Sequence, residues 1–268
     1  MAGIIFGCLV PHPPVIVPDV GRGGEREISA TTRAMEQLTD QLAQQKPETA
    51  LIISPHGSYH PDAMGILTSS SSSGDLSVWG SSAPRQNYDN DLNLVELIQQ
   101  EAKRANIPVK SIGKGNYNLD HGVMVPLYFL GKALKGVSLV PLTFCWLPLE
   151  KHFAFGKAIG KAVEQSKKRV ALIASGDLSH RLIPSAPAGY DPMGKIFDEK
   201  LGKALSSWDA RSVLGMDQQL IERAGECGLR PVVILLGALD GLKVKPKILS
   251  YEGPFGVGYM VASFEVTS

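Results

Sequence analysis

Two histidines stand directly after apolar segments of this chain, and histidine is a residue that binds metal ions. His12 follows the segment Gly3–Val10, and His56 follows Thr49–Ile53. Prolines beside both histidines restrict the backbone, which stiffens a loop that carries a ligand. Neutral imidazole nitrogens are good ligands for iron, zinc, copper and nickel. We therefore predict that these two histidines hold one metal ion. The alternative for each is a hydrogen-bonded loop residue.

An acidic residue at the end of a late apolar segment could supply a third ligand. Glu252 follows the segment Val244–Tyr251 and precedes Gly253, which allows close approach of the backbone. Two imidazoles and one carboxylate form the facial triad that leaves positions on Fe(II) open for substrate and oxygen. We predict that His12, His56 and Glu252 form such a triad. The alternative for Glu252 is a solvated turn residue.

Three further polar residues stand beside apolar segments and are candidates for catalysis. Asp177 and His180 follow the segment Arg169–Ala174, where an ordinary helix cap is the alternative. His121 follows Asp120 at the start of an apolar helix. It would face a substrate, although an ordinary N-terminal cap made by Asp120 explains the same pattern.

Alternating strands and helices must position these residues, which predicts an α/β fold with a sheet covered on both faces. Ligands of open α/β sheets bind outside the carboxyl ends of the strands, so parallel strands would bring the candidate residues into one crevice. No stretch is typical of an interdomain linker, and we expect one domain over residues 1–268. Strands are expected over 3–10, 49–53, 108–111, 137–143, 169–174, 244–251 and 258–264, with a hairpin over 63–80. Helices are expected over 25–45, 89–104, 123–134, 149–165 and 191–205, with shorter ones over 209–216 and 218–227.

The composition excludes several classes of partner. The net charge is +1, which gives no reason to expect nucleic acid or an anionic membrane as a partner. No apolar run reaches about 18 residues, and the N-terminus lacks the pattern of a signal peptide. Cys8, Cys145 and Cys227 are far apart and form no CxxC pair, so we expect three buried thiols in a reducing cytosol. The expected location is cytoplasmic.

Five short motifs, taken in order, carry a resemblance to a known family. The chain resembles the class III extradiol ring-cleavage dioxygenases, specifically their LigB-type catalytic subunit. Within that superfamily it is most similar to the AmmeMemoRadiSam system protein B branch, which is related to the Memo proteins. The resemblance covers essentially the whole chain. The motifs are "VPHPP" at 10–14, "SPHG" at 54–57, "LDHG" at 119–122, "SGDLSH" at 175–180 and "YEGPFGVGY" at 251–259.

The resemblance implies a single α/β domain with a mixed central sheet and a role for each candidate residue. His12 and His56 match the two histidine ligands of the iron, and Glu252 falls where the carboxylate ligand is expected. His180 matches the histidine that acts as acid and base, and His121 matches the one that helps to hold substrate or oxygen. The Memo relatives differ, because they have a cysteine in the third ligand position.

The resemblance also implies a reaction, which is the opening of a catechol-type aromatic ring by O₂ at non-haem Fe(II). Asp177 would orient a neighbouring histidine. Mn(II) or another divalent metal would suit the same ligands. A smaller partner subunit, or self-association, is left open.

Three other functions remain alternatives at this stage. One is a Memo-like metal-binding protein without ring cleavage, and the second is a component of a radical-SAM-linked modification system. The third is a metal-dependent hydrolase, which would need a second metal site that uses His60 or Asp177. A serine hydrolase is excluded because the chain has no GxSxG motif.

Overall fold

Uninterrupted apolar runs form the centre of the main sheet. The structure is a computed structural model that describes residues 2–83, 85–113 and 117–267. Parallel strands that are covered on both faces are hydrophobic along their whole length, and the four central strands of this sheet have that character. They are β1 (Gly3–Val10), β9 (Arg169–Ser175), β2 (Thr49–Ser54) and β8 (Ser138–Thr143), which lie side by side in that order and are all parallel.

Antiparallel pairings on both sides make the sheet mixed, as expected. The strand order is β10-β11-β1-β9-β2-β8-β3-β6. Strand β11 (Tyr259–Thr267) is antiparallel to β1, and β10 (Lys243–Glu252) is antiparallel to β11. Strand β10 therefore runs in the same direction as β1 and ends at the same edge of the sheet. At the other side, β3 (Met64–Leu67) is antiparallel to β8, and β6 (Val109–Ile112) is parallel to β3.

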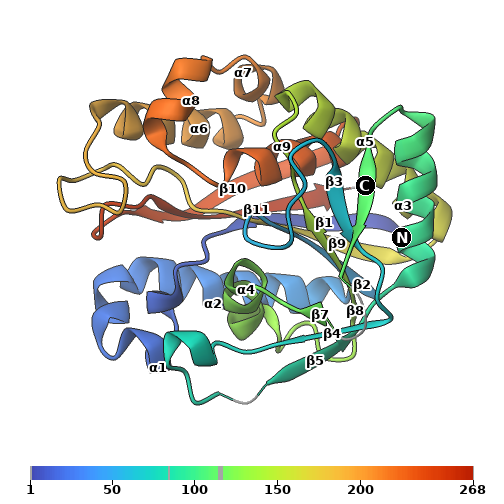
Figure 1. Cartoon of the computed structure of the whole chain (residues 1–268), viewed down its shortest axis with the longest axis horizontal. Coiled ribbons are helices and arrows are strands. Elements are labelled where there is room, and N and C mark those ends of the chain that lie inside the picture. The colour runs from blue at the N-terminus through green and yellow to red at the C-terminus, as the bar shows by residue number, and fades with distance from the viewer. Residues whose placement is uncertain (1, 84, 114–116, 268) are drawn as a thin grey trace.

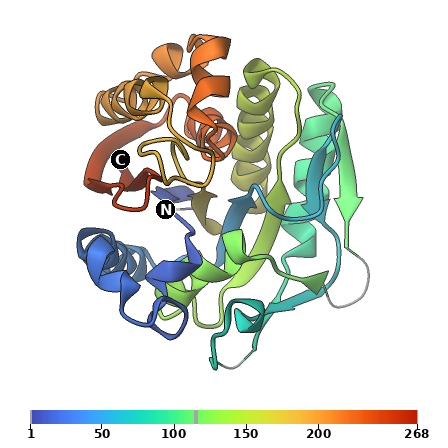
Figure 2. The ribbon, with the colours of Figure 1, turned by 60° about the vertical axis from the view of Figure 1, so that its left-hand side comes forward.

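Helices cover both faces of the main sheet, which confirms the predicted α/β class (Figures 1 and 2). One hydrophobic core includes side chains of α2 (Ser29–Gln45) and α4 (His121–Leu130). The core on the opposite face includes side chains of α3 (Leu92–Arg104), α5 (Leu149–Ser166), α6 (Pro192–Ser206) and α9 (Leu229–Ala238). The shorter helices are α1 (Pro18–Gly21), α7 (Ala210–Leu214) and α8 (Gln218–Ala224). Among the described helices, none is long and apolar enough to span a membrane.

The hairpin expected over 63–80 is wrong, because the two strands of this segment join different sheets. Strand β3 belongs to the main sheet, and the serine-rich segment Ser71–Gly74 forms β4 in a second sheet. Buried Ser72 donates a hydrogen bond to Asn90 Oδ1 (2.9 Å), which satisfies its hydroxyl away from water. The partners of β4 in this small sheet are β5 (Gln86–Asp89) and β7 (Tyr117–Asn118).

Glycines bring α9 unusually close to α5. A β-carbon on Gly156 of α5 would overlap the carbonyl oxygen of Ile234, and one on Gly237 of α9 would overlap that of Phe153. Such overlap within a packed core is destabilising, so only glycine allows these helices to approach this closely. The contact fixes where α9 begins, and therefore where the segment before it lies.

Candidate metal centre

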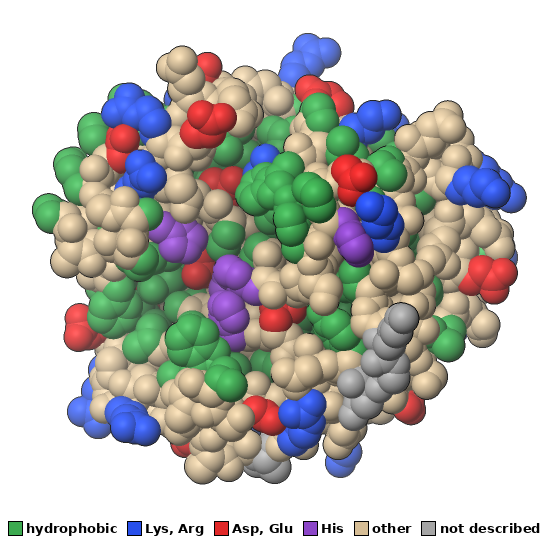
Figure 3. Space-filling view, viewed as in Figure 1, with side chains coloured by type: hydrophobic (Ala, Val, Ile, Leu, Met, Phe, Trp, Pro, Cys, Tyr) green, Lys and Arg blue, Asp and Glu red, His purple; other side chains and the backbone are tan. Residues whose placement is uncertain are grey.

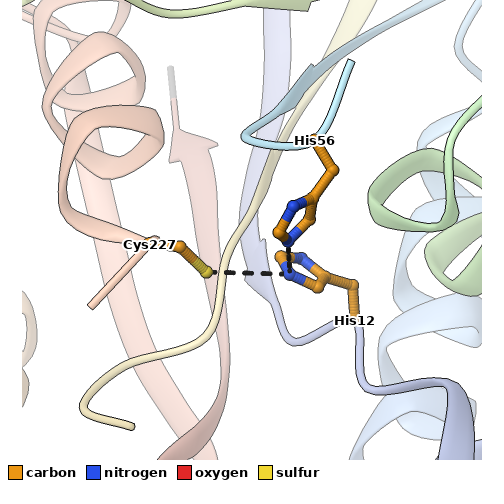
Figure 4. Close-up of side chains that lie close together, drawn as sticks. All are labelled: His12, His56 and Cys227. Carbon is orange, nitrogen blue, oxygen red and sulfur yellow. Dashed lines mark hydrogen bonds between the residues drawn. The ribbon is translucent and has the colours of Figure 1, made fainter. Parts of the chain in front are cut away.

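The carboxyl ends of β1 and β2 bring His12 and His56 together. The Nε2 atoms of the two rings are 3.0 Å apart (Figure 4). The Sγ of Cys227 lies 3.7 Å from His12 Nε2. One donor atom from each of these three residues lies within 4.8 Å of the others. The structure thus forms a potential metal site from three distant parts of the sequence.

Two glycines and the backbone of Asp177 hold Cys227 in this group. A β-carbon on Gly176, just after β9, would overlap the Cα of Gly228, so the segment before α9 can lie against β9 only because these residues are glycines. The Cys227 N–H donates to the carbonyl oxygen of Asp177 (3.2 Å), and the Asp177 N–H donates to Cys227 Sγ (3.3 Å). This reciprocal pair aims the sulfur toward His12.

Glu252, which we predicted as the third ligand, lies outside this group in the structure. It lies at the same edge of the sheet as His12, but β11 separates its strand from β1. Neighbouring strands are about 4.8 Å apart, so this places the two backbones about 10 Å apart. The Glu252 Oε1 accepts hydrogen bonds from the N–H and the hydroxyl of Thr31, both 2.6 Å long. Cys227 takes the place that we expected Glu252 to occupy.

The hydrogen bonds of His12 leave its Nε2 unprotonated. Its Nδ1 lies 2.9 Å from the hydroxyl oxygen of Ser175, and that hydroxyl donates to the carbonyl oxygen of Gly122. Because the Ser175 proton is used in this way, its oxygen accepts the Nδ1 proton of His12. The Nε2 lone pair then faces His56 and Cys227, which is the arrangement that a metal ligand needs.

Burial keeps the histidines of this region neutral. Burial, and then the nearby His56, His121 and His180, lower the pKa of His12 well below its ordinary value. Partial burial lowers the pKa values of His56, His121 and His180 as well. A metal ion binds neutral imidazole, so these shifts favour ligation over protonation at neutral pH.

Asp177 lies beside His12, where the motif placed it. Its Oδ1 accepts a hydrogen bond from the His12 N–H (2.9 Å), and its Oδ2 lies 3.8 Å from His12 Nε2. Burial raises the pKa of this carboxyl to about 7. It is followed by a loop and caps no helix, so the helix-cap alternative fails.

His121 lies on the open side of the site together with an exposed tryptophan. Its ring stacks on His56, with 4.2 Å between centroids, and meets Trp79 edge-on at 5.3 Å. The side chain of Asp120 does not cap α4 but accepts a hydrogen bond from the Ser54 hydroxyl (2.5 Å). Histidine and hydrophobic side chains gather near the middle of this face of the molecule (Figure 3). The structure therefore places His121 beside His56 with an aromatic wall next to it.

His180 lies in the loop after β9 and has a free ring nitrogen. The loop is fixed by its backbone, because the His180 N–H donates to the carbonyl oxygen of Ala224 (3.2 Å). The His180 Nδ1 is buried and has no hydrogen-bond partner among the described residues. His180 is one of the histidines that lower the pKa of His12.

A buried carboxyl supports the His180 loop and makes stability depend on pH. Asp198 accepts hydrogen bonds from the Ser179 N–H (2.8 Å) and the Tyr251 hydroxyl (2.7 Å), and burial raises its pKa from 3.8 to about 6. An acid whose pKa is higher in the folded state holds its proton more tightly when folded. The free energy of unfolding therefore falls as the pH rises from about 4 to about 6.

We expect Asp198→Asn to remove this pH dependence. The variant keeps groups that can bond to Ser179 and Tyr251 but has no carboxyl to ionise. The free energy of unfolding should be measured with urea at a series of pH values. Between pH 4 and 7, the value for the variant should rise by up to about 3 kcal/mol relative to that of the unsubstituted protein. Other titrating groups are shared and cancel. A difference that stays constant over this range would contradict the prediction.

Sequence reasoning missed Cys227 as a potential metal ligand. We expected it to be one of three buried thiols, and the available signal was its place between glycines just before a helix. Another histidine, His152, is fully buried, with its ring nitrogens near the carbonyl oxygens of Pro148 (3.0 Å) and Cys145 (3.1 Å).

Several curated proteins are similar to this chain. "Protein CA_C1420" of Clostridium acetobutylicum is 40% identical over 97% of this chain and 57% of its own length. A 3,4-dihydroxyphenylacetate 2,3-dioxygenase of Escherichia coli is 30% identical over 61% of this chain and 62% of its length. A 2-aminophenol 1,6-dioxygenase beta subunit of a Pseudomonas species is 25% identical over 82% of this chain and 76% of its length. The chain thus spans less than two thirds of the first two relatives.

The fold and the family agree with the site. The crystal structure of the uncharacterized protein JW3007 from Escherichia coli K12 matches 97% of this chain and 99% of its own, with a TM-score of 0.66 and 18% identity, which shows a shared fold. The family of the catalytic LigB subunit of aromatic ring-opening dioxygenase matches residues 7–262. Since the match covers nearly the whole chain, the protein belongs to the LigB family, as its motifs predicted.

Proposed function

We propose that this protein is a metal-dependent dioxygenase that opens the ring of a small aromatic diol with O₂. The observation that carries the proposal is the group formed by His12, His56 and Cys227, in a chain that belongs to the LigB family. Fe(II) is the proposed metal, and Mn(II) or another divalent ion is the alternative. The expected cytoplasmic location is part of the same proposal.

The distances in the group suit one metal ion. Histidine nitrogens bind a metal such as zinc at about 2.0–2.1 Å and a cysteine sulfur at about 2.3 Å, so ligands of one ion lie about 3.0–3.6 Å apart. The His12–His56 distance of 3.0 Å falls in this range, the His12–Cys227 distance of 3.7 Å is just above it, and all three donor atoms lie within 4.8 Å of one another. The unprotonated Nε2 of His12 points into the same space. These residues therefore fit a bound metal.

The surrounding residues provide the acid–base groups that such a reaction needs. A metal held here would act as a Lewis acid that makes the hydroxyl groups of a diol easier to deprotonate. His180 is neutral at neutral pH because burial lowers its pKa, so its imidazole can accept a proton from the diol. His121 can donate a hydrogen bond to the bound oxygen or substrate. Asp177 orients His12 through its backbone N–H.

The relatives support an aromatic substrate and O₂. One is named as a dioxygenase of 3,4-dihydroxyphenylacetate and another as a dioxygenase of 2-aminophenol. The second is a beta subunit, which supports either a partner subunit or self-association for this chain. No membrane or nucleic acid enters the proposal.

Cys227 also favours a second candidate, a metal-binding protein that does not cleave rings. Memo relatives resemble this chain and carry a cysteine as third ligand, and the structure brings a cysteine to that place. Such a protein could serve as a component of a radical-SAM-linked modification system. A hydrolase with a second metal site finds no support, because the described residues contain no second group of potential ligands.

Electron paramagnetic resonance distinguishes these functions. The protein is loaded with Fe(II) without oxygen, nitric oxide is added in place of O₂, and spectra are recorded with and without catechol. The dioxygenase proposal expects an iron–nitrosyl signal that changes when catechol is added. A signal that ignores catechol would favour the second candidate, and a lack of any iron signal in the unsubstituted protein would contradict both. His56→Ala should lose the signal.

A further inference from the structure

We propose that Arg230 binds a carboxylate group carried by the aromatic substrate. This inference rests on the proposed function and specifies its substrate class as an aromatic acid. Arg230 lies in the first turn of α9, three residues after Cys227. It belongs to a cluster of one cation and three aromatic side chains, Phe144, Trp146 and Tyr59, which we call the arginine cluster.

The guanidinium group of Arg230 has few partners among the residues that the structure describes. Only 14% of its side chain is exposed, and its Nε is buried without a hydrogen-bond partner among the described residues. Its nearest carboxylate oxygen is Glu226 Oε1, at 3.7 Å, which is too far for a hydrogen bond. The other oxygen of Glu226 already accepts a hydrogen bond from the Leu229 N–H (2.6 Å). A guanidinium has five N–H donors, so most of its capacity is unused.

The arginine cluster lies between the two segments that carry potential ligands. On one side, Arg230 is close in sequence to Cys227. On the other, its guanidinium carbon lies 4.4 Å from the centroid of Trp146, whose ring lies 6.0 Å from that of Tyr59. The Trp146 N–H donates to the carbonyl oxygen of Pro61 (3.0 Å), in the same loop as His56. A ligand at Arg230 would therefore lie between the segment that carries Cys227 and the loop that carries His56.

Two of the aromatic rings in the arginine cluster are exposed to solvent. Trp146 is 58% exposed and Tyr59 is 45% exposed, which is unusual for large aromatic side chains. Aromatic side chains of this kind can pack against the ring or the short apolar arm of a substrate. The cluster thus offers apolar contact next to a cation.

The charge balance favours a carboxylate over a dianion. A single guanidinium supplies one positive charge, and its planar fork matches the two oxygens of a carboxylate. Burial raises the pKa of Glu226, which lies at 3.7 Å, to about 7, so this carboxyl only partly offsets the charge of Arg230 near neutral pH. A monoanionic aromatic acid therefore fits the cluster better than a phosphate ester.

Calorimetric titration of matched probes tests the inference. The Fe(II)-loaded protein, kept free of oxygen, is titrated with 3,4-dihydroxyphenylacetate, with its methyl ester and with phenylacetate. We expect the acid to bind about 10- to 100-fold more tightly than the ester, because the ester cannot form a charge-assisted pair. In Arg230→Gln this preference should disappear while the affinity for the ester stays within about twofold.

Two further variants separate binding from support of the fold. Arg230→Lys should keep part of the preference, because it keeps the charge without the fork. Arg223→Gln, which removes an exposed arginine paired with Asp191, should keep all of it. Equal binding of acid and ester by the unsubstituted protein would overturn the inference without any variant. If Arg230→Gln weakens the binding of acid and ester equally, Arg230 only supports the fold, and the inference is overturned as well.

The same titrations distinguish failure of the carboxylate site from failure of the proposed function. If the catechol hydroxyls add nothing to affinity but phenylacetate still binds in a way that depends on Arg230, the carboxylate site stands and the dioxygenase proposal fails. If the diols bind and no carboxylate is preferred, the dioxygenase proposal stands and the carboxylate site is wrong.

Discussion

Replacing Cys227 with alanine is expected to lower the affinity of the protein for its metal by at least about 100-fold. Loss of an outer group that merely supports a ligand costs about 10- to 100-fold in metal affinity, and loss of a ligand itself should cost more. Cys227 Sγ is one of three donor atoms that lie within 4.8 Å of each other. The affinity is measured by competition with a chelator of known strength, for the protein loaded with Fe(II) in the absence of oxygen.

Glu252→Gln is the matched control for this prediction. Glu252 was the carboxylate expected from the sequence, and in the structure it bonds to Thr31. The variant should hold its metal as tightly as the unsubstituted protein and lose only about 1–2 kcal/mol of stability from weakened hydrogen bonds. The opposite result, with metal lost in Glu252→Gln and kept in Cys227→Ala, would restore the triad with a carboxylate.

His180→Ala is expected to lower kcat by about 10²- to 10⁴-fold for any diol that the unsubstituted protein cleaves, and to leave the metal content unchanged. His180 lies near His12, yet it is absent from the group of potential ligands. Its lowered pKa, which keeps the imidazole neutral, makes it the candidate base. Steady-state kinetics and metal analysis of the same preparation check both parts of the prediction.

The pH profile gives a readout that a structural role would not change. Burial lowers the pKa of His180, so the neutral form persists to lower pH than for an ordinary histidine. The decrease of kcat/KM at acid pH should therefore occur below the pH range in which an ordinary histidine titrates. This decrease should be absent in His180→Ala. His60→Ala, which removes a histidine outside the group, should retain full activity. Loss of metal from His180→Ala would assign it a ligand role and contradict the prediction.

The pairing of His12 and His56 could be predicted from the sequence because it depends only on where two parallel strands end. Strands β1 and β2 are continuous apolar runs, and residues after parallel strands meet at one edge of the sheet. His12 and His56 obey this rule, with only β9 between their strands. The resemblance to LigB-type subunits rests on the same motifs, and the family match confirms it.

The positions of Glu252 and Cys227 could not be predicted from short segments of the sequence. Glu252 also ends a strand at the correct edge, but the order of strands in the sheet is set by pairings across the whole chain, and β11 lies between. Cys227 follows no strand. Its position depends on the contact between Gly176 and Gly228, which are far apart in the sequence and close only after α9 has packed. The failed hairpin over 63–80 has the same cause, since each strand found a more distant partner.

The central position of β1 affects how the chain can fold during its synthesis. Strand β1 is made early, but its two neighbours are β9 (Arg169–Ser175) and β11 (Tyr259–Thr267). At roughly 5–20 residues per second, a ribosome needs on the order of 10–50 s to proceed from β1 to β11. Until β9 has been made, this apolar strand has no partner on either side, and one side stays open until β11 has been made, which exposes the nascent chain to aggregation and to chaperones. His12 can meet Cys227 only after most of the chain has been translated, so the proposed metal ion would enter its site after that point.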